Sequence, residues 1–136
     1  MKKDWTIKKA RMALDSKEIS SKELTEYYLN RISEFSQLNA YITICSEKAL
    51  DSAKEVDDLI AKGEKRALLG IPLAIKDLFC TKGIRTTAGS KMLADFVPEY
   101  ESTVSQNLLN DGAIFLGKTN MDEFAMGSAN ITSYFG

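Results

Sequence analysis

The chain has 136 residues, the usual size of one domain, and its 44% hydrophobic and 27% charged residues are ordinary proportions for a folded soluble protein. Eighteen basic and nineteen acidic side chains leave a net charge of -1, so the chain lacks the basic excess with which proteins bind nucleic-acid phosphates tightly. It has no histidine, which excludes a Ser-His-Asp or Cys-His pair and a His-ligated zinc within these residues. A general base here must be Lys, Asp, Glu or Tyr.

The start of the chain shows no apolar signal-peptide core, and no apolar run reaches the roughly 20 residues of a membrane span. We therefore expect a cytoplasmic protein without a membrane segment. Cys45 and Cys80 each lie inside an apolar run, which is typical of buried free thiols rather than of a disulfide or a metal site.

The first third of the chain predicts helices. Ile7, Ala10, Met12 and Leu14 indicate a short first helix, and residues 20–23 form a capping box that opens a second one. The apolar side chains of this second helix recur at intervals of three and four, which is typical of a face that packs on a core. They are Leu24, Tyr27, Tyr28, Ile32 and Phe35.

A strand, a helix and a second strand-like run follow. Residues 40–45 are rich in β-branched and aromatic side chains and predict a buried strand, after which Ser46 is expected to cap a helix that ends at Gly63. Residues 68–75 are apolar and predict another strand, with Pro72 at its start or at an irregular point. This order predicts that the two strands form a parallel pair.

The last part of the chain predicts a loop over residues 81–101, with a helical turn near residues 91–96. A capping box at residues 103–106 predicts a helix to about residue 110 and a strand over residues 113–117. A polar turn and a short helix over residues 118–128 come next. The tripeptide Gly-Lys-Thr at residues 117–119 lacks the upstream glycine of a phosphate-binding P-loop, so it does not predict a nucleotide site.

Lys76 stands out chemically because it follows an apolar strand suited to the interior. Burial lowers the pKa of a lysine and turns it into a neutral amine that accepts a proton near pH 7, as in serine-lysine hydrolases. Two ordinary alternatives remain open: an ion pair between Lys76 and Asp77, or an exposed lysine at a sheet edge.

Three blocks in order resemble the amidase signature family: Gly-Ile-Pro-Leu-Ala-Ile-Lys-Asp at residues 70–77, Thr-Lys-Gly-Ile-Arg-Thr-Thr-Ala-Gly-Ser at residues 81–90, and residues 117–128. The Met-Asp-Glu-Phe-Ala-Met-Gly-Ser segment of the last block is similar to the glutaminase subunits of tRNA-dependent amidotransferases within that family. The resemblance implies an α/β fold, with a mixed central sheet flanked by helices and preceded by N-terminal helices. It also implies that residues 1–136 are the N-terminal portion of a single, incomplete amidase-signature domain.

The resemblance further implies a mechanism in which one serine attacks an amide, a second serine on a cis peptide bond relays its proton, and a lysine is the base. Lys76 matches that lysine, and Met126, Gly127 and Ser128 match a loop that lines the substrate pocket. The Gly/Ser-rich stretch that carries both serines in relatives is missing from these 136 residues, so the chain alone is expected to hydrolyse nothing.

The parent protein is then expected to hydrolyse glutamine and to supply ammonia for the ATP-dependent conversion of Glu-tRNA(Gln) to Gln-tRNA(Gln) in translation. Its partners would be subunits B and C of a heterotrimer, with the tRNA held mainly by a partner and with ATP and Mg used by the complex; no cofactor or metal is expected on this chain. Two alternatives are a free-standing amidase for small amides and a non-catalytic module whose N-terminal helices dock a partner.

Overall fold

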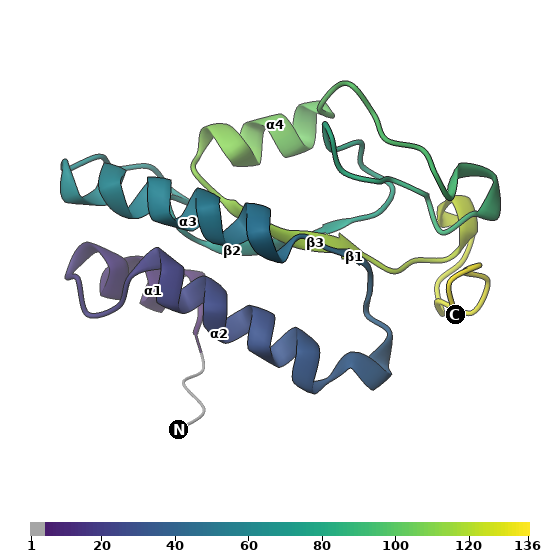
Figure 1. Cartoon of the computed structure of the whole chain (residues 1–136), viewed down its shortest axis with the longest axis horizontal. Helices are drawn as coiled ribbons and strands as arrows, with labels where there is room; N and C mark the ends of the chain where they lie inside the picture. The colour runs from purple at the N-terminus through teal and green to yellow at the C-terminus, as the bar shows by residue number, and fades with distance from the viewer. Residues whose placement is uncertain (1–4) are drawn as a thin grey trace.

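The computed structural model describes residues 5–136 and combines helices with one small sheet (Figure 1). Residues 1–4, which belong to the start of the chain considered for a signal peptide, lie outside the described part. No helix within residues 5–136 has the length and apolarity that crossing a membrane requires. The helices are α1 (Ile7–Asp15), α2 (Ser21–Glu34), α3 (Ser46–Ala61) and α4 (Thr103–Asn110), with the 3₁₀ turns η1 (Ser36–Leu38), η2 (Lys91–Leu93) and η3 (Glu123–Ala125).

In the described sheet, the central strand runs antiparallel to one neighbour and parallel to the other. Its strands are β1 (Tyr41–Ile44), β2 (Pro72–Lys76) and β3 (Ile114–Thr119), in the order β1-β3-β2. Strand β3 runs antiparallel to β1, with Ile44 opposite Gly117, and parallel to β2, with Lys76 opposite Thr119. The sheet is therefore mixed, as the family resemblance implies.

The predicted parallel pairing of the first two strands is wrong. Strand β3 lies between β1 and β2, so these two strands do not touch through their backbones, and the parallel pair is β2 with β3. The physical reason is burial, because five of the six residues of β3 are buried while β1 and β2 are only partly covered. The most buried strand takes the central position, where both of its faces and both of its edges are shielded.

Helices cover both faces of the sheet, as expected, and alternate side chains of β3 supply the two cores. Ile114 and Leu116 pack with buried residues of α3 and with partly buried residues of α2. Phe115 packs on the other face with Ile75 of β2 and with partly buried leucines of α4. Figure 1 shows α4 on one side of the sheet and α1 and α2 on the other. Helix α3 packs on the same face as α2, in the cluster with Ile114 and Leu116.

The apolar faces of α1 and α2 pack against other parts of this chain. Ala10 and Leu14 of α1 and Leu24 of α2 form a buried cluster with Ile71, which precedes β2. The capping box predicted for α2 is confirmed, because the Ser20 hydroxyl accepts a hydrogen bond from the backbone N–H of residue 23 and that glutamate's carboxylate accepts one from the backbone N–H of residue 20. Both amphipathic faces are thus occupied by this chain's own core.

Two predicted helix caps are displaced by one residue. Cys45, and not Ser46, precedes the first residue of α3, and it makes no side-chain cap. Ser102, and not Thr103, caps α4, where its hydroxyl accepts a hydrogen bond from the N–H of Ser105. A cap residue keeps extended backbone angles, and Ser102 adopts them whereas Thr103 is already helical.

The segment between β2 and α4 is mostly loop, as predicted, with η2 inside the range expected to hold a helical turn. The two cysteines are free thiols, but each is half-buried rather than fully buried. Burial raises the pKa of the Cys45 thiol, and the positive charges of Lys48 and Lys118 partly oppose that shift.

Candidate active site

Lys76 ends β2, and its side chain is exposed within residues 5–136. The desolvation expected for this lysine therefore does not come from the described part of the chain. Its position agrees with the alternative of an exposed lysine at a sheet edge, since β2 is an edge strand of the described sheet. The other alternative, an ion pair with Asp77, is wrong, because Asp77 pairs with Lys118.

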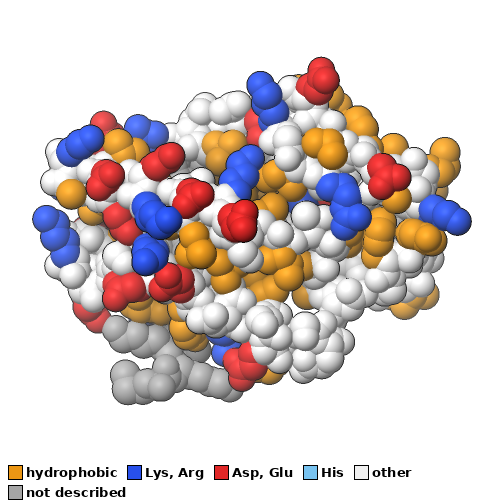
Figure 2. Space-filling view, in the orientation of Figure 1, with side chains coloured by type: hydrophobic (Ala, Val, Ile, Leu, Met, Phe, Trp, Pro, Cys, Tyr) orange, Lys and Arg blue, Asp and Glu red, His pale blue; other side chains and the backbone are white. Residues whose placement is uncertain are grey.

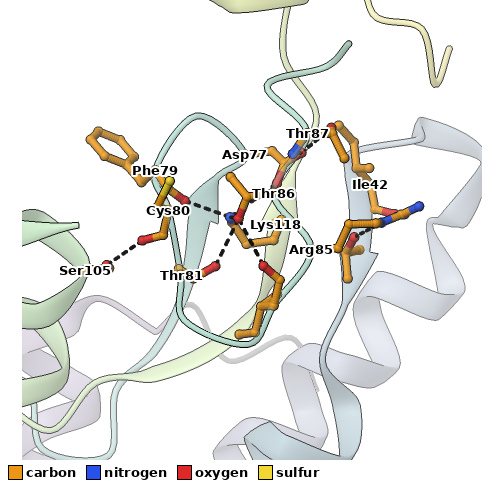
Figure 3. A network of polar contacts seen from close by, with 12 residues as sticks. Ile42, Asp77, Phe79, Cys80, Thr81, Arg85, Thr86, Thr87, Ser105 and Lys118 are labelled. Atoms are coloured by element: carbon orange, nitrogen blue, oxygen red, sulfur yellow. Dashed lines mark hydrogen bonds and ion pairs between the residues drawn. The ribbon is translucent and has the colours of Figure 1, made fainter. Parts of the chain in front are cut away.

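The buried lysine of the described chain is Lys118, whose side chain is 1% exposed. Figure 3 shows the polar network to which it belongs. Its Nζ lies 3.3 Å from Oδ1 of Asp77 and donates hydrogen bonds of 2.8 Å to the Phe79 carbonyl and to the Thr86 hydroxyl. Burial lowers the pKa of Lys118, and the carboxylate of Asp77 partly offsets that shift. The ammonium group is thus held by three oxygens from the segment that follows β2.

The second carboxylate oxygen of Asp77 also takes part in this network. Oδ2 accepts hydrogen bonds from the Thr87 backbone N–H, at 2.8 Å, and from the Thr87 hydroxyl, while Oδ1 has the ion pair with Lys118 and no hydrogen bond. Successive residues of an extended chain point to opposite sides, so burial of Asp77 is consistent with an outward Lys76. The network fixes the end of β2, where Lys76 lies.

Sequence reasoning missed Lys118. The Gly-Lys-Thr tripeptide is relevant only as a possible nucleotide motif, and it does not reveal that a lysine is buried. Residues 113–116, which are all buried, come shortly before Lys118, and this run is the one local signal that the lysine enters the interior.

An open pocket of about 500 Å³ brings Lys76 together with part of the loop predicted to line the substrate site. Gly127 and Ser128 line it, whereas Met126 does not and is 80% exposed. The other lining residues come from η1, the segment before β1, the end of β3 and the loop after it. They are Leu38, Ala40, Thr119, Asn120, Met121, Asp122, Ala125 and Asn130.

Asp122 is a second residue that sequence reasoning missed, and it organises the loop of this pocket. Its carboxylate accepts hydrogen bonds from the backbone N–H groups of residues 129–132 and from the Thr132 hydroxyl. These bonds, from Thr132 and Asn130 first, lower the pKa of Asp122 to about 2. The donors lie seven to ten residues after the acceptor, so no short turn motif in the sequence announces them.

Within residues 5–136, no three His, Cys, Asp or Glu side chains lie close enough together to hold a metal ion. The chemistry that the described pocket offers is that of one amine, one carboxylate, hydroxyl groups and side-chain and backbone amides. This set suits a proton transfer next to an amide carbonyl.

Residues 23–136 match the family model described as Amidase. A curated protein of Gluconobacter oxydans, named as the A subunit of glutamyl-tRNA(Gln) amidotransferase, is 58% identical over 98% of this chain and 27% of its own length. The protein of the same name from Rhizobium meliloti is 57% identical over 96% of this chain and 27% of its own length. The chain therefore spans about a quarter of the curated relatives that it matches.

Solved structures agree with these relatives. The peptide amidase of Stenotrophomonas maltophilia superposes with a TM-score of 0.84 at 32% identity, over 89% of this chain and 26% of that one. A structure described as a crystal structure of an amidase gives a TM-score of 0.88 at 32% identity, over 97% of this chain and 30% of that one. The match to the family model covers most of the chain, and the fold is shared, so the chain belongs to the amidase family.

Proposed function

We propose that this chain is the N-terminal portion of one amidase domain, in a glutaminase that serves as the A subunit of a glutamyl-tRNA(Gln) amidotransferase. The observation that carries the proposal is the 53–58% identity, over nearly the whole chain, to curated proteins with that name. The identity to solved structures of comparable overlap is only 31–33%. The chain is thus closer to the tRNA-dependent branch of the family.

In this proposal Lys76 is the proton acceptor. The family pattern has one serine attack the glutamine amide, while its proton passes through a second serine to the lysine amine. Lys76 lines the same pocket as Gly127 and Ser128, and this supports its role as the acceptor. A lysine that accepts a proton near pH 7 needs a desolvated amine, so we expect the longer protein to cover this pocket.

The remaining assignments follow from the same proposal. Subunits B and C would be the partners, and ATP and Mg would be used by the complex, while glutamine would bind at the pocket of this chain. Glu-tRNA(Gln) would be held mainly by a partner, since this chain lacks a basic excess and has a net charge of -1. The complex would act in the cytoplasm.

The proposal is tested with a full-length enzyme that carries this segment, assembled with its partner subunits. Glutamate release from glutamine is measured for the wild type, for Lys76→Ala and for a control, Lys65→Ala, whose side chain is exposed on the loop after α3. We expect Lys76→Ala to lower kcat by about 10²–10⁴-fold, the usual contribution of a general base, and Lys65→Ala to keep wild-type activity. Equal activity of the two variants would refute the role of Lys76.

A free-standing amidase is the second candidate, because the solved peptide amidase shares the fold at 32% identity. Growth of a strain that lacks glutaminyl-tRNA synthetase separates the two candidates. The amidotransferase supports such growth when supplied with its partner genes, whereas an independent amidase does not. The third candidate, a non-catalytic docking module, is disfavoured because α1 and α2 bury their apolar faces within this chain and Lys76 lines a pocket.

A further inference from the structure

The pocket that Lys76 lines is also lined by a loop whose shape depends on one carboxylate. We propose that Asp122 is a positioning residue: it fixes the loop of residues 126–132 and thereby sets how tightly the pocket holds its amide substrate. This inference rests on the proposed glutaminase function of the pocket. Asp122 is not assigned a step in bond making or breaking.

The first observation is the number of hydrogen bonds that end on this side chain. Oδ2 accepts from the N–H groups of Ala129, at 3.1 Å, and Asn130, at 2.8 Å. Oδ1 accepts from the N–H groups of Ile131, at 2.8 Å, and Thr132, at 3.0 Å, and from the Thr132 hydroxyl at 3.0 Å. Four successive backbone amides thus converge on one carboxylate, which turns this part of the loop around it.

The second observation is the close approach of the loop to the same carboxylate. Asp122 is 5% exposed, and a Cβ added at Gly127 would lie 2.5 Å from both its Cγ and its Oδ2. Glycine is therefore required at residue 127 by contact, and not by an unusual φ angle. The segment that carries Gly127 and Ser128 packs directly on the side chain that holds residues 129–132.

The third observation concerns the backbone just before this loop and within it. Phe124 and Ala125 have φ angles of 52° and 58°, in the left-handed region that such residues seldom occupy, and Asn130, a residue type that enters this region more readily, has a φ of 53°. Such angles persist where the surroundings hold them. The bonds to Asp122 hold Asn130, and a hydrogen bond from the Phe124 N–H to the Ala88 carbonyl, at 2.8 Å, holds the other end.

The test compares variants of the assembled full-length enzyme in glutamine hydrolysis. In Asp122→Asn, an amide NH₂ replaces one oxygen and faces N–H groups that need acceptors, so part of the loop loses its anchor. We expect kcat/KM for glutamine to fall about 10- to 100-fold, as for a pocket wall displaced by about 1 Å, with most of the loss in KM because the loop acts on binding. The midpoint of the pH profile of kcat/KM should stay at its wild-type value, because Asp122 is not the base.

A second pair of variants keeps the carboxylate. Thr132→Val removes the hydroxyl donor and should raise KM by less than Asp122→Asn does, whereas Thr132→Ser keeps the hydroxyl and should keep the wild-type KM. The matched control is Asp58→Asn, because Asp58 is exposed on α3. It should behave as the wild type.

If Asp122 only stabilised the folded enzyme, its variants would show a different pattern of kcat and KM. Loss of folded enzyme lowers kcat in proportion to the active fraction and leaves KM unchanged. An unchanged KM for both Asp122→Asn and Thr132→Val would overturn the proposal while the glutaminase function stood. If neither the wild type nor Asp58→Asn released glutamate, the proposed function and this inference would fall together.

Discussion

The ammonium of Lys118 lies 3.3 Å from the carboxylate of Asp77, and both side chains are almost fully buried. The pair joins β3 to the segment that follows β2, one residue after Lys76. A buried ion pair contributes little net stability compared with apolar residues, but loss of one partner leaves the other charge buried and unpaired. The pair therefore acts mainly as a constraint on how this segment folds.

Lys118→Met tests this constraint. It should lower the free energy of unfolding by about 3–5 kcal/mol, because Asp77 then stays in the interior without a counter-charge. Denaturant unfolding of the full-length protein measures the loss, with Lys65→Met as the surface control. A loss below about 1 kcal/mol would mean that the charges are not buried as a pair.

The double variant separates the charge from the packing. Asp77→Asn in the Lys118→Met background removes the unpaired charge, and an asparagine oxygen can still accept from Thr87. At least about 1 kcal/mol of the lost stability should return. No recovery would mean that Lys118 acts through packing alone.

The elements of this fold were largely predictable, whereas the partners of each strand and of each lysine were not. Local patterns at residues 20–23 and 113–117 predict a helix start and a buried strand, because caps and apolar runs are local features. The position of β3 between β1 and β2 depends on contacts between segments far apart in the chain. A strand-helix-strand pattern cannot show that a later strand will separate the first two.

The two lysines illustrate the same limit at the site. Lys76 follows an apolar strand and is expected to be buried, yet it is exposed within residues 5–136, while Lys118 is covered by residues 77–87 folding over it. That cover is a tertiary feature without a motif. The family resemblance placed Lys76 near Gly127 and Ser128, which the shared pocket supports, but it gave no reason to single out Asp122.

Asp122 predicts a pH dependence of stability. Its pKa is lowered from 3.8 to about 2 by hydrogen bonds to the ionised form. Between these two pKa values the unfolded chain binds a proton at Asp122 more readily than the folded chain does. The contribution of Asp122 to the free energy of unfolding is therefore complete above about pH 4 and is lost as the pH falls through about 2. The difference in thermal midpoint between wild type and Asp122→Asn should therefore shrink over this interval.

The measurement is a series of thermal melts from about pH 5 to about pH 2 for the full-length wild type, Asp122→Asn and Asp58→Asn. Asp58→Asn corrects for the general effect of removing one carboxylate from the surface. A difference between wild type and Asp122→Asn that stays constant down to about pH 2 would contradict the assignment of this transition to Asp122.

Gly127→Ala tests the contact between the loop and the carboxylate. The added Cβ would lie 2.5 Å from Cγ of Asp122, so either the loop or the carboxylate has to move. We expect a loss of about 1–3 kcal/mol, as for overpacking, and a higher KM for glutamine. Melts and glutaminase assays on the full-length enzyme measure the two effects.

Gly63→Ala is the matched comparison. Gly63 has a φ of +87° and no atom within 4 Å of its missing Cβ, so alanine there adds backbone strain and no clash. It should cost about 1–2 kcal/mol and leave KM unchanged. If Gly127→Ala altered KM no more than Gly63→Ala, the contact with Asp122 would have no bearing on the pocket.

The 136-residue chain by itself should self-associate. Both outer strands of the described sheet lack a further neighbour, and Leu38 and Ile44 are 68% and 51% exposed and line an apolar pocket of about 450 Å³ between α2 and β1. Figure 2 shows hydrophobic side chains at the surface between groups of charged ones. A net charge of -1 supplies little repulsion between copies.

Size-exclusion chromatography and calorimetry of the purified chain test this expectation. Ile44→Lys places a charge on the β1 edge and should reduce association, whereas Ile7→Lys, at a residue of α1 that is 54% exposed, should not. A monomer with a cooperative melt would contradict the expectation. It would also show that the described strands and their helices bury enough apolar surface to fold without the rest of the domain, since cooperative unfolding requires a core that the chain supplies itself.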